Sequence, residues 1–324
     1  GVHTSKSFSL FETGEALFRG DEPSPTRSSV LVRLNHSHVR IGSFQRHYAE
    51  ARTDRLEKLL DYSATHLLAE LGGKDNLPVR FLRAVVERSA RLCAEWLVAG
   101  FVHGVLNSDN MTVTGESFDY GPYRFLPHYD PDFTAAYFDH GGLYAFGHQP
   151  RAVYRNLGRL AQSLSPLDPS ASWTTALDDF VQRLRAWRSQ GLVARLGLRS
   201  QGVDEDEALA EAVWDFLGAT GASYDGVLFD LWGGPAGLPR ALRGPRRAIY
   251  DDPRFAALRA RLETTTPLDP SRLELAYFHR DEPCHLVIDE IERIWQAIDE
   301  RDDWQPFEDK VSAIISSYIS EVVL

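Results

Sequence analysis

Hydrophobic residues recur at intervals of three and four along most of the chain, a spacing that predicts amphipathic α-helices. In the clearest case, 79–101, residues such as Phe81, Val85, Leu92 and Trp96 form one apolar stripe, with Gly100 near its end. Another helix is predicted over 55–71, stopped by the glycines at 72 and 73. The same pattern returns after Pro150, over 152–164, 171–189, 204–218, 252–264, 284–300 and 306–322.

A different pattern marks the beginning of the chain. Residues 7–18 predict two short strands around a turn at Thr13-Gly14-Glu15, and residues 30–34 predict another strand. Residues 20–29, rich in Pro, Ser, Asp and Glu, predict a loop, and helical sequence begins at about Gln45. The loop-rich segments are 127–150 and 233–248. The prediction is an α+β protein with a small β-rich start and a large helical body.

Charge and cysteine content narrow the function classes. The chain of 324 residues has 35 Lys and Arg against 46 Asp and Glu, a net charge of −11. That balance argues against broad nucleic-acid binding, because phosphate backbones require a basic surface. Its apolar runs are far shorter than the roughly 20 residues that a membrane span requires, so no membrane partner is expected. Two distant cysteines without metal-ligand spacing exclude a disulfide scaffold and a zinc site, and a cytoplasmic location is expected.

The segment 103–121 carries most of the candidate chemistry. A loop presents Asp109 and Asn110 after the long helix; residues 111–118 predict a hairpin, which returns Asp119 beside Asn110. Amide and carboxylate oxygens suit Mg²⁺ or Mn²⁺ held between protein and nucleotide phosphates. Asp109 could accept a proton from an attacking hydroxyl, an arrangement that protein kinases use. The alternative is that all three residues serve as turn and capping residues.

Two arginines form the second candidate feature. Arg33 lies in the apolar strand and Arg40 just after it, and neither belongs to a run of charges. Planar, bidentate guanidinium groups could clamp phosphates there. Surface salt bridges are the alternative, and the residues alone favour that alternative.

Other residues invite a functional interpretation. His103 is expected to pack and hydrogen-bond the loop rather than act as a base. The histidines at 128, 140 and 148 lie among aspartates, but their spacing fits no strong metal motif. Cys93, on an apolar helix face, is expected to be a core thiol.

Several strings together resemble one known family. Residues 32–44, 103–121, 129–133, 139–150 and 156–162 are similar to selenoprotein O and its bacterial relatives, kinase-like protein adenylyltransferases. The resemblance is dense over about residues 1–165. It is weaker beyond, at 275–278 and 288–295.

The resemblance implies a protein-kinase-like fold that binds ATP in reverse, with Mg²⁺ or Mn²⁺, and transfers AMP to Ser, Thr or Tyr of proteins with release of pyrophosphate. It implies that Asp109 is the catalytic base and that Asn110 and Asp119 are metal ligands. Arg33 and Arg40 would contact the nucleotide phosphates, and Asp119 would share in nucleotide binding. Residues 1–44 would be the C-terminal part of the small nucleotide-binding lobe. Residues 45–324 would form the large lobe, with the catalytic loop and metal site.

The chain departs from the family at its beginning. The family's upstream glycine-rich segment and nucleotide-binding Lys have no counterpart among the lysines at 6, 58, 74 and 310, so an N-terminal truncation with an exposed apolar surface is expected. Other readings stay open: a kinase that transfers the γ-phosphoryl group, an inactive lobe that acts as a binding module, and transfer of UMP instead of AMP.

Overall fold

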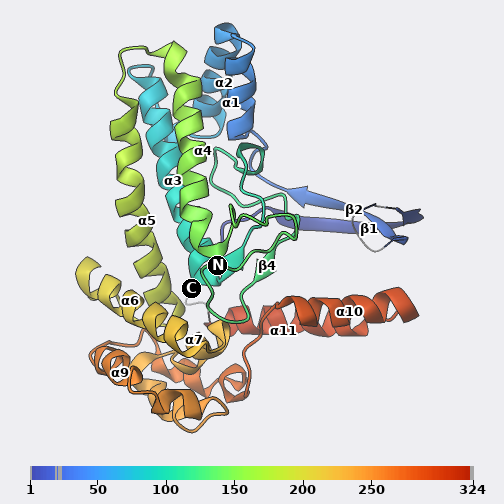
Figure 1. Ribbon diagram of the computed structural model, residues 1–324, viewed down its shortest axis with the longest axis vertical. Helices are drawn as coiled ribbons and strands as arrows, with labels where there is room; N and C mark the ends of the chain where they lie inside the picture. The colour runs from blue at the N-terminus through green and yellow to red at the C-terminus, as the bar shows by residue number, and fades with distance from the viewer. Residues whose placement is uncertain (1, 19, 21–23, 322–324) are drawn as a thin grey trace.

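The computed structural model describes residues 2–18, 20 and 24–321, apart from the side chains of 318–321. A body of helices carries a long two-stranded ribbon that projects to one side (Figure 1). The α+β class predicted from the sequence is confirmed. The helices are α1 Ile41–Ala49, α2 Thr53–His66, α3 Leu77–Ala99, α4 Gln149–Leu164, α5 Trp173–Arg195, α6 Val203–Thr220, α7 Tyr224–Asp230, α8 Leu238–Ala241, α9 Phe255–Glu263, α10 Ile288–Arg301 and α11 Gln305–Glu321.

Helix α3 is the centre of the body, with α4 and α5 packed along it (Figure 1). Its apolar stripe is buried as predicted, and Phe81 and Trp96 are among the largest fully buried side chains. Cys93 also lies in this core, where burial raises the pKa of its thiol, so the predicted core role is confirmed. The stripe therefore holds the long helices together through apolar burial.

A glycine ends α3 for two separate reasons. Gly100 caps the helix in the left-handed conformation, with φ of 66°, which side chains rarely adopt. A Cβ at this position would also lie 2.8 Å from the ring of Tyr224, which packs across the helix end and donates a hydrogen bond to the Leu97 carbonyl. The chain then forms β3, Phe101–Val102, paired with β4, Arg124–Phe125, and enters the segment that carries the candidate site.

The ribbon differs from the strands predicted for this region. Strand β1, Lys6–Leu17, is continuous and pairs antiparallel with β2, Thr26–Leu34. The predicted turn around Gly14 is wrong: the strand continues through it, and the register shifts between Glu12 and Ala16. A strand can accommodate unpaired residues as a bulge when a partner strand continues beside it. The local sequence does not reveal that partner, so it predicts a turn instead. The predicted loop over 20–29 is likewise too long, since β2 begins at Thr26.

Both strands expose apolar side chains. Phe8 and Phe11 are each 71% exposed, and Val30 and Leu34 are more than half exposed. The exposed apolar surface that the sequence predicted is therefore present on the ribbon.

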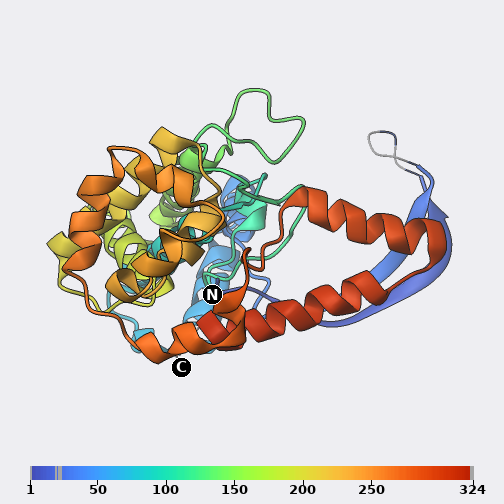
Figure 2. The same cartoon turned by 90° about the horizontal axis from the view of Figure 1, so that it is seen from below.

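Helices α10 and α11 form an arm that reaches the far end of the ribbon (Figure 2). Arg27 on β2 donates to the carbonyl of Ile298, at 2.8 Å, and to the carboxylate of Asp302, at 2.8 Å. These bonds tie the beginning of β2 to the end of α10.

The predicted helices after Pro150 are all present, with ends shifted by a few residues; residue 322, the predicted end of the last, lies outside the described residues. Helix α7 was not predicted, the loop predicted over 233–248 contains α8, and α1 begins at Ile41 rather than near Gln45. Within the described part of the chain, no helix combines the length and hydropathy that a membrane crossing requires.

Candidate active site

Asn107 shapes the loop that presents Asp109 and Asn110. Its side-chain oxygen accepts hydrogen bonds from the backbone N–H groups of Asp109, at 2.9 Å, and Asn110, at 3.1 Å. The two bonds cap a single helical turn, Ser108–Asn110. This cap fixes the loop backbone, and the Asp109 side chain is left exposed. The sequence analysis assigned no role to Asn107, although an Asn two residues before an Asp is a recognisable turn signal.

The carboxylate of Asp109 packs against the first turn of α1. A Cβ on Gly42 would lie only 1.9 Å from Oδ1 of Asp109, so only glycine fits there without displacing the carboxylate. An open pocket of about 520 Å³ adjoins this contact, and Arg40, Ser43 and Arg46 are among its lining residues. Within the described residues, no hydrogen bond or ion pair ends on the Asp109 carboxylate. It is therefore free to accept a proton from a bound hydroxyl.

Asn110 and Asp119 each offer an oxygen. The Asn110 amide nitrogen donates to the Val105 carbonyl, at 2.9 Å, which leaves the amide oxygen without a donor in the described structure. Asp119 is exposed and holds a φ of 57°, an uncommon conformation for a residue other than glycine. Such backbone outliers concentrate at functional sites.

The two predicted arginines contact the residues on either side of Asp119. The guanidinium carbon of Arg33 lies 4.4 Å from the centroid of the Tyr120 ring, and the same side chain donates to the Ser5 hydroxyl. Arg40 lies 6.0 Å from the Phe118 ring and donates to the backbone carbonyl of Asp109, at 3.3 Å. Neither arginine forms an ion pair among the described residues, so their charges stay available to an anion. Among the residues that the structure describes, neither arginine forms the surface salt bridge considered as the alternative.

Residues 111–118 turn back as predicted, but not as a hairpin of two paired strands. Thr112 closes the turn, accepting from the Glu116 N–H and donating to the Glu116 carbonyl. Met111 and Val113 form backbone bonds with Ile41 and Val39, while Ser117 bonds with His3 and Ser5. The predicted pairing is wrong because the two sides of the turn form backbone hydrogen bonds with segments distant in the sequence and not with each other. These bonds attach the turn to the segment that carries Arg40 and to the residues just before β1.

Two buried amides on α4 hydrogen-bond the segment that carries the site, and neither was predicted from the sequence. The Asn156 amide nitrogen donates to the Leu106 carbonyl, at 2.8 Å, and to the sulfur of Met111, at 3.2 Å. Gln149 accepts from the His103 N–H, at 3.0 Å, and donates to the Phe101 carbonyl, at 2.9 Å. Both side chains are fully buried. A polar residue on an otherwise apolar helix face is the signal that could have found them.

His103 has the structural role that the sequence predicted. Its ring is buried, and Nε2 lies 3.2 Å from the Phe118 carbonyl, to which it donates in the fitting tautomer. Burial lowers the pKa of the ring, although the hydrogen bond to Phe118 and the charge of Asp119 oppose that shift. A neutral imidazole therefore links the start of the loop to the residue before Asp119.

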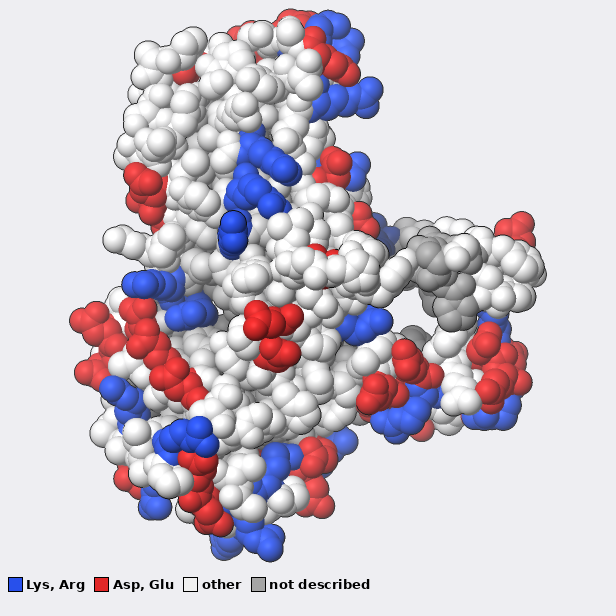
Figure 3. Space-filling view, in the orientation of Figure 1, with Lys and Arg blue, Asp and Glu red and all other residues white. Residues whose placement is uncertain are grey.

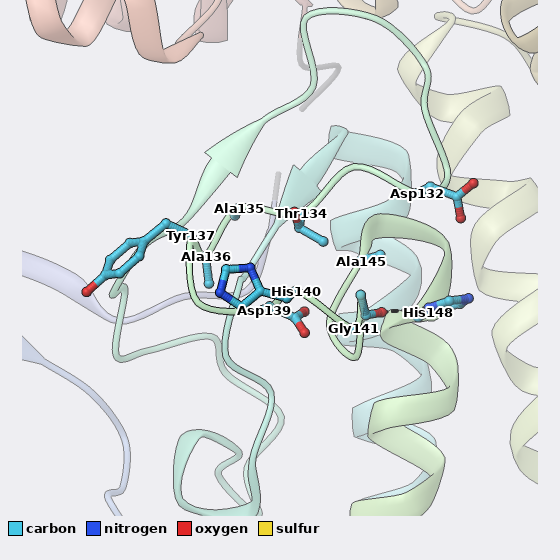
Figure 4. A pocket seen from close by; sticks show the side chains of 11 residues that line it. Asp132, Thr134, Ala135, Ala136, Tyr137, Asp139, His140, Gly141, Ala145 and His148 are labelled. Carbon is cyan, nitrogen blue, oxygen red and sulfur yellow. Dashed lines mark hydrogen bonds between the residues drawn. The ribbon is translucent and has the colours of Figure 1, made fainter.

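A second pocket lies within the loop-rich segment. It measures about 640 Å³ and is lined by residues between Asp132 and His148 (Figure 4). The carboxylate of Asp139 accepts from the N–H groups of Leu143 and Tyr144, each at 2.8 Å, and Nδ1 of His148 bonds the Gly142 carbonyl at 2.7 Å. These polar groups shape the loop itself. The described residues contain no group of three or more His, Cys, Asp or Glu side chains placed to hold a metal ion.

Asn110 and Asp119 carry the oxygen types that a divalent cation takes. Mg²⁺ prefers oxygen ligands and is commonly held by one or two carboxylates together with substrate phosphates. Among the described residues, no donor occupies the Asn110 amide oxygen or the Asp119 carboxylate, so both could serve as such ligands.

Comparison with known proteins shows the family. The family described as "Protein adenylyltransferase SelO" matches residues 1–234. "Protein nucleotidyltransferase YdiU" of Gloeobacter violaceus is 40% identical over 98% of this chain and 67% of its own length. Proteins of the same name from Synechocystis and from Bradyrhizobium strain BTAi1 are 39% and 32% identical over 98% of the chain, and 69% and 65% of their own lengths. The chain thus spans about two-thirds of these relatives, and it belongs to the SelO family of protein adenylyltransferases.

Proposed function

We propose that Asp109, Asn110, Asp119, Arg33 and Arg40 form the site of a metal-dependent transfer of AMP from ATP to hydroxyl groups of proteins. The membership in a family of protein nucleotidyltransferases sets the reaction class. The observation that supports the assignment of residues is that Arg33 and Arg40 contact the residues on either side of Asp119, with Arg40 also bonded to Asp109. Residues 1–44 would belong to a nucleotide-binding lobe and 45–324 to a large lobe of protein-kinase-like fold.

Asp109 would act as the general base. Its exposed carboxylate would accept the proton of a Ser, Thr or Tyr hydroxyl as that oxygen forms a bond to the α-phosphorus of ATP. The bond between the α-phosphorus and the bridging oxygen would break, and pyrophosphate would leave. The contact with Gly42 would hold the carboxylate in position against the pocket, and positioning of this kind contributes much of the rate in transfer to phosphorus.

Asn110 and Asp119 would hold Mg²⁺ or Mn²⁺, which supplies charge neutralisation to the phosphates when bound. Arg33 and Arg40 would neutralise further phosphate charge. Stacking on Tyr120 fixes the plane of the Arg33 guanidinium, so less side-chain freedom is lost when phosphate binds. Removal of one such contact is expected to cost about 2–4 kcal/mol of transition-state stabilisation.

The deciding experiment uses ATP labelled separately at the α- and γ-phosphates, with Mg²⁺ or Mn²⁺ and a mixture of acceptor proteins. The chain, Asp109→Ala and Asp119→Ala are compared with Asp299→Ala, which removes an exposed carboxylate on α10. Incorporation of α-label that both site variants lose and the control keeps is the expected result. A parallel arm with α-labelled UTP tests the choice of nucleotide.

Incorporation of γ-label would identify a kinase and contradict the proposal. Absence of label together with absence of nucleotide binding would favour a binding module instead.

A further inference from the structure

The outer face of α4 carries a row of arginines. Arg151, Arg155 and Arg159 follow one another at intervals of four residues, which places them on one side of the helix. Positive side chains gather over α4 on the face shown in Figure 3. Among the described residues, none of the three lies within ion-pair distance of a carboxylate. We call this face, together with Gly158, the α4 stripe.

Some arginines elsewhere in the protein have acidic partners. Arg183 pairs with Glu87, Arg195 with Asp225, and Arg246 with Asp230. In a chain of net charge −11, three arginines that lie side by side on one helix, with no acidic partner among the described residues, form a local concentration of positive charge. Their mutual repulsion is unfavourable for the isolated helix, since like charges four residues apart destabilise it.

Gly158 interrupts the same face, and nothing inside the protein requires a glycine there. It lies in the middle of α4, its φ is not in the left-handed region, and a Cβ would meet no atom within 4 Å. Glycine inside a helix is less favourable than alanine by roughly 0.5–1 kcal/mol. The missing side chain leaves a flat site beside Arg155 and Arg159. Such a site suits the close approach of a backbone from outside the protein.

The α4 stripe connects directly to the candidate active site. The Arg159 guanidinium donates to the oxygen of Asn156, at 3.3 Å, and the amide nitrogen of Asn156 donates to the Leu106 carbonyl in the catalytic loop. Helix α4 also packs against α1, whose first turn lines the pocket beside Asp109. A polypeptide lying on the stripe would therefore pass close to the loop that holds the base.

We propose that the α4 stripe docks an acidic segment of the protein whose hydroxyl group is modified, an inference that rests on the proposed protein acceptor. Carboxylates of that segment would pair with Arg151, Arg155 and Arg159, and its backbone would cross the helix at Gly158. Guanidinium groups bind carboxylates in a bidentate fashion, which gives such docking both charge and direction. The net negative charge of the chain favours a polypeptide over a nucleic acid, whose phosphates require a broad basic surface.

The test measures binding without ATP, by fluorescence anisotropy of a labelled peptide with one serine flanked on both sides by glutamates. An analogue with glutamines in place of the glutamates is the neutral probe. Arg151→Glu is compared with Arg261→Glu, which makes the same charge change at another exposed arginine, on α9, without an ion pair in the described structure. Arg151→Glu is expected to weaken binding of the acidic peptide about tenfold, the usual loss for a charged hydrogen-bonding partner. Arg261→Glu should bind like the unaltered chain.

The variant Gly158→Ala distinguishes a role of this glycine in docking from a role in folding. The added methyl group should raise Tm by about 1–2 °C through helix propensity. The same variant should bind the acidic peptide more weakly, which a purely structural glycine would not do.

Equal binding of the acidic and neutral peptides would overturn the proposal, as would equal binding by the chain and Arg151→Glu. Tighter binding of a single-stranded DNA with the same charge as the peptide would overturn the choice of a polypeptide. The chain could also bind the acidic peptide through Arg151 and yet transfer no nucleotide label. That result would contradict the proposed function but would still support the docking surface.

Discussion

Oδ1 of Asp109 lies 1.9 Å from the point where a Cβ on Gly42 would be. The first turn of α1 and the loop that carries Asp109 therefore meet at a contact that admits only glycine. Backbone bonds from Ile41 to Met111 and from Val113 to Val39 hold the two segments in this register. The position of the candidate base is thus determined jointly by two segments far apart in the sequence.

Gly42→Ala should reduce AMP transfer about 100-fold, because a displacement of the base of about 1 Å costs that much. The group displaced is the end of a flexible side chain, so the fold should survive and Tm should change little. Turnover and nucleotide affinity would be measured together, with turnover falling and affinity kept. Unchanged turnover would show that the contact does not position Asp109.

Arg33 should depend on the ring of Tyr120 for its orientation. Tyr120→Leu removes the cation–π contact, worth about 0.5–1 kcal/mol at an exposed site, and should weaken nucleotide binding about threefold. Tyr120→Phe keeps the ring and serves as the control, although it loses the hydroxyl's bonds to the Ser117 carbonyl and to the Thr4 hydroxyl. Calorimetric titration with ATP and Mg²⁺ measures both variants. Equal losses in the two would point to the hydroxyl instead of the ring.

Asn156 should matter to the stability of the fold. Asn156→Asp replaces the donor with an acceptor, and the buried Leu106 carbonyl then loses its partner at a cost of about 1–3 kcal/mol in the free energy of unfolding. Urea denaturation measures this loss, and Gln162→Glu, an exposed amide on the same helix, is the control. A variant as stable as the unaltered chain would show that the loop does not depend on this bond.

His103 should make the protein sensitive to acid. Burial lowers the pKa of His103 in the folded state below its ordinary value of 6.5. Below that pH the unfolded chain binds a proton that the folded chain does not, so the free energy of unfolding falls as pH decreases, by at most about 1.4 kcal/mol per pH unit.

Urea denaturation at a series of pH values measures this dependence. In His103→Gln, the free energy of unfolding should lose this part of its decline below pH 6.5. His66→Gln, at an exposed position, should retain the decline. The same decline in both variants would show that other groups cause it.

Asp230 is expected to stabilise the distal helices without affecting the site. This buried carboxylate accepts two bonds from Arg246, at 2.7 and 2.8 Å, and one from the Tyr250 hydroxyl, at 2.8 Å. Burial raises the pKa of Tyr250, so its hydroxyl keeps the proton that it donates. Asp230→Ala should lower the free energy of unfolding by about 3–5 kcal/mol, because the Arg246 guanidinium loses its buried partner and keeps only the exposed Glu282 as an acidic partner.

Thermal denaturation measures the effect of Asp230→Ala, with the exposed Asp281→Ala as the control. Similar stability of the two variants would contradict the assigned role.

Much of the helical body could be predicted because its pattern is local. The stripe through Phe81 and Trp96 requires only that one face of α3 be buried, whatever covers it. Gly100 likewise marks the helix end by its own conformational freedom. The order of Asp109, Asn110 and Asp119 along the chain was enough to suggest the chemistry.

What the tertiary structure decided was the choice of partners. Gly14 predicts a turn when only its neighbours are considered, and it lies within β1 because β2 continues beside it. The segments on either side of the turn at Thr112 pair with residues near Arg40 and Thr4 instead of with each other. Residue types and spacing thus determined the helices and the candidate groups. Because pairing depends on which distant backbone supplies a donor or acceptor, only the folded chain could place Arg33, Arg40 and Gly42 around those groups.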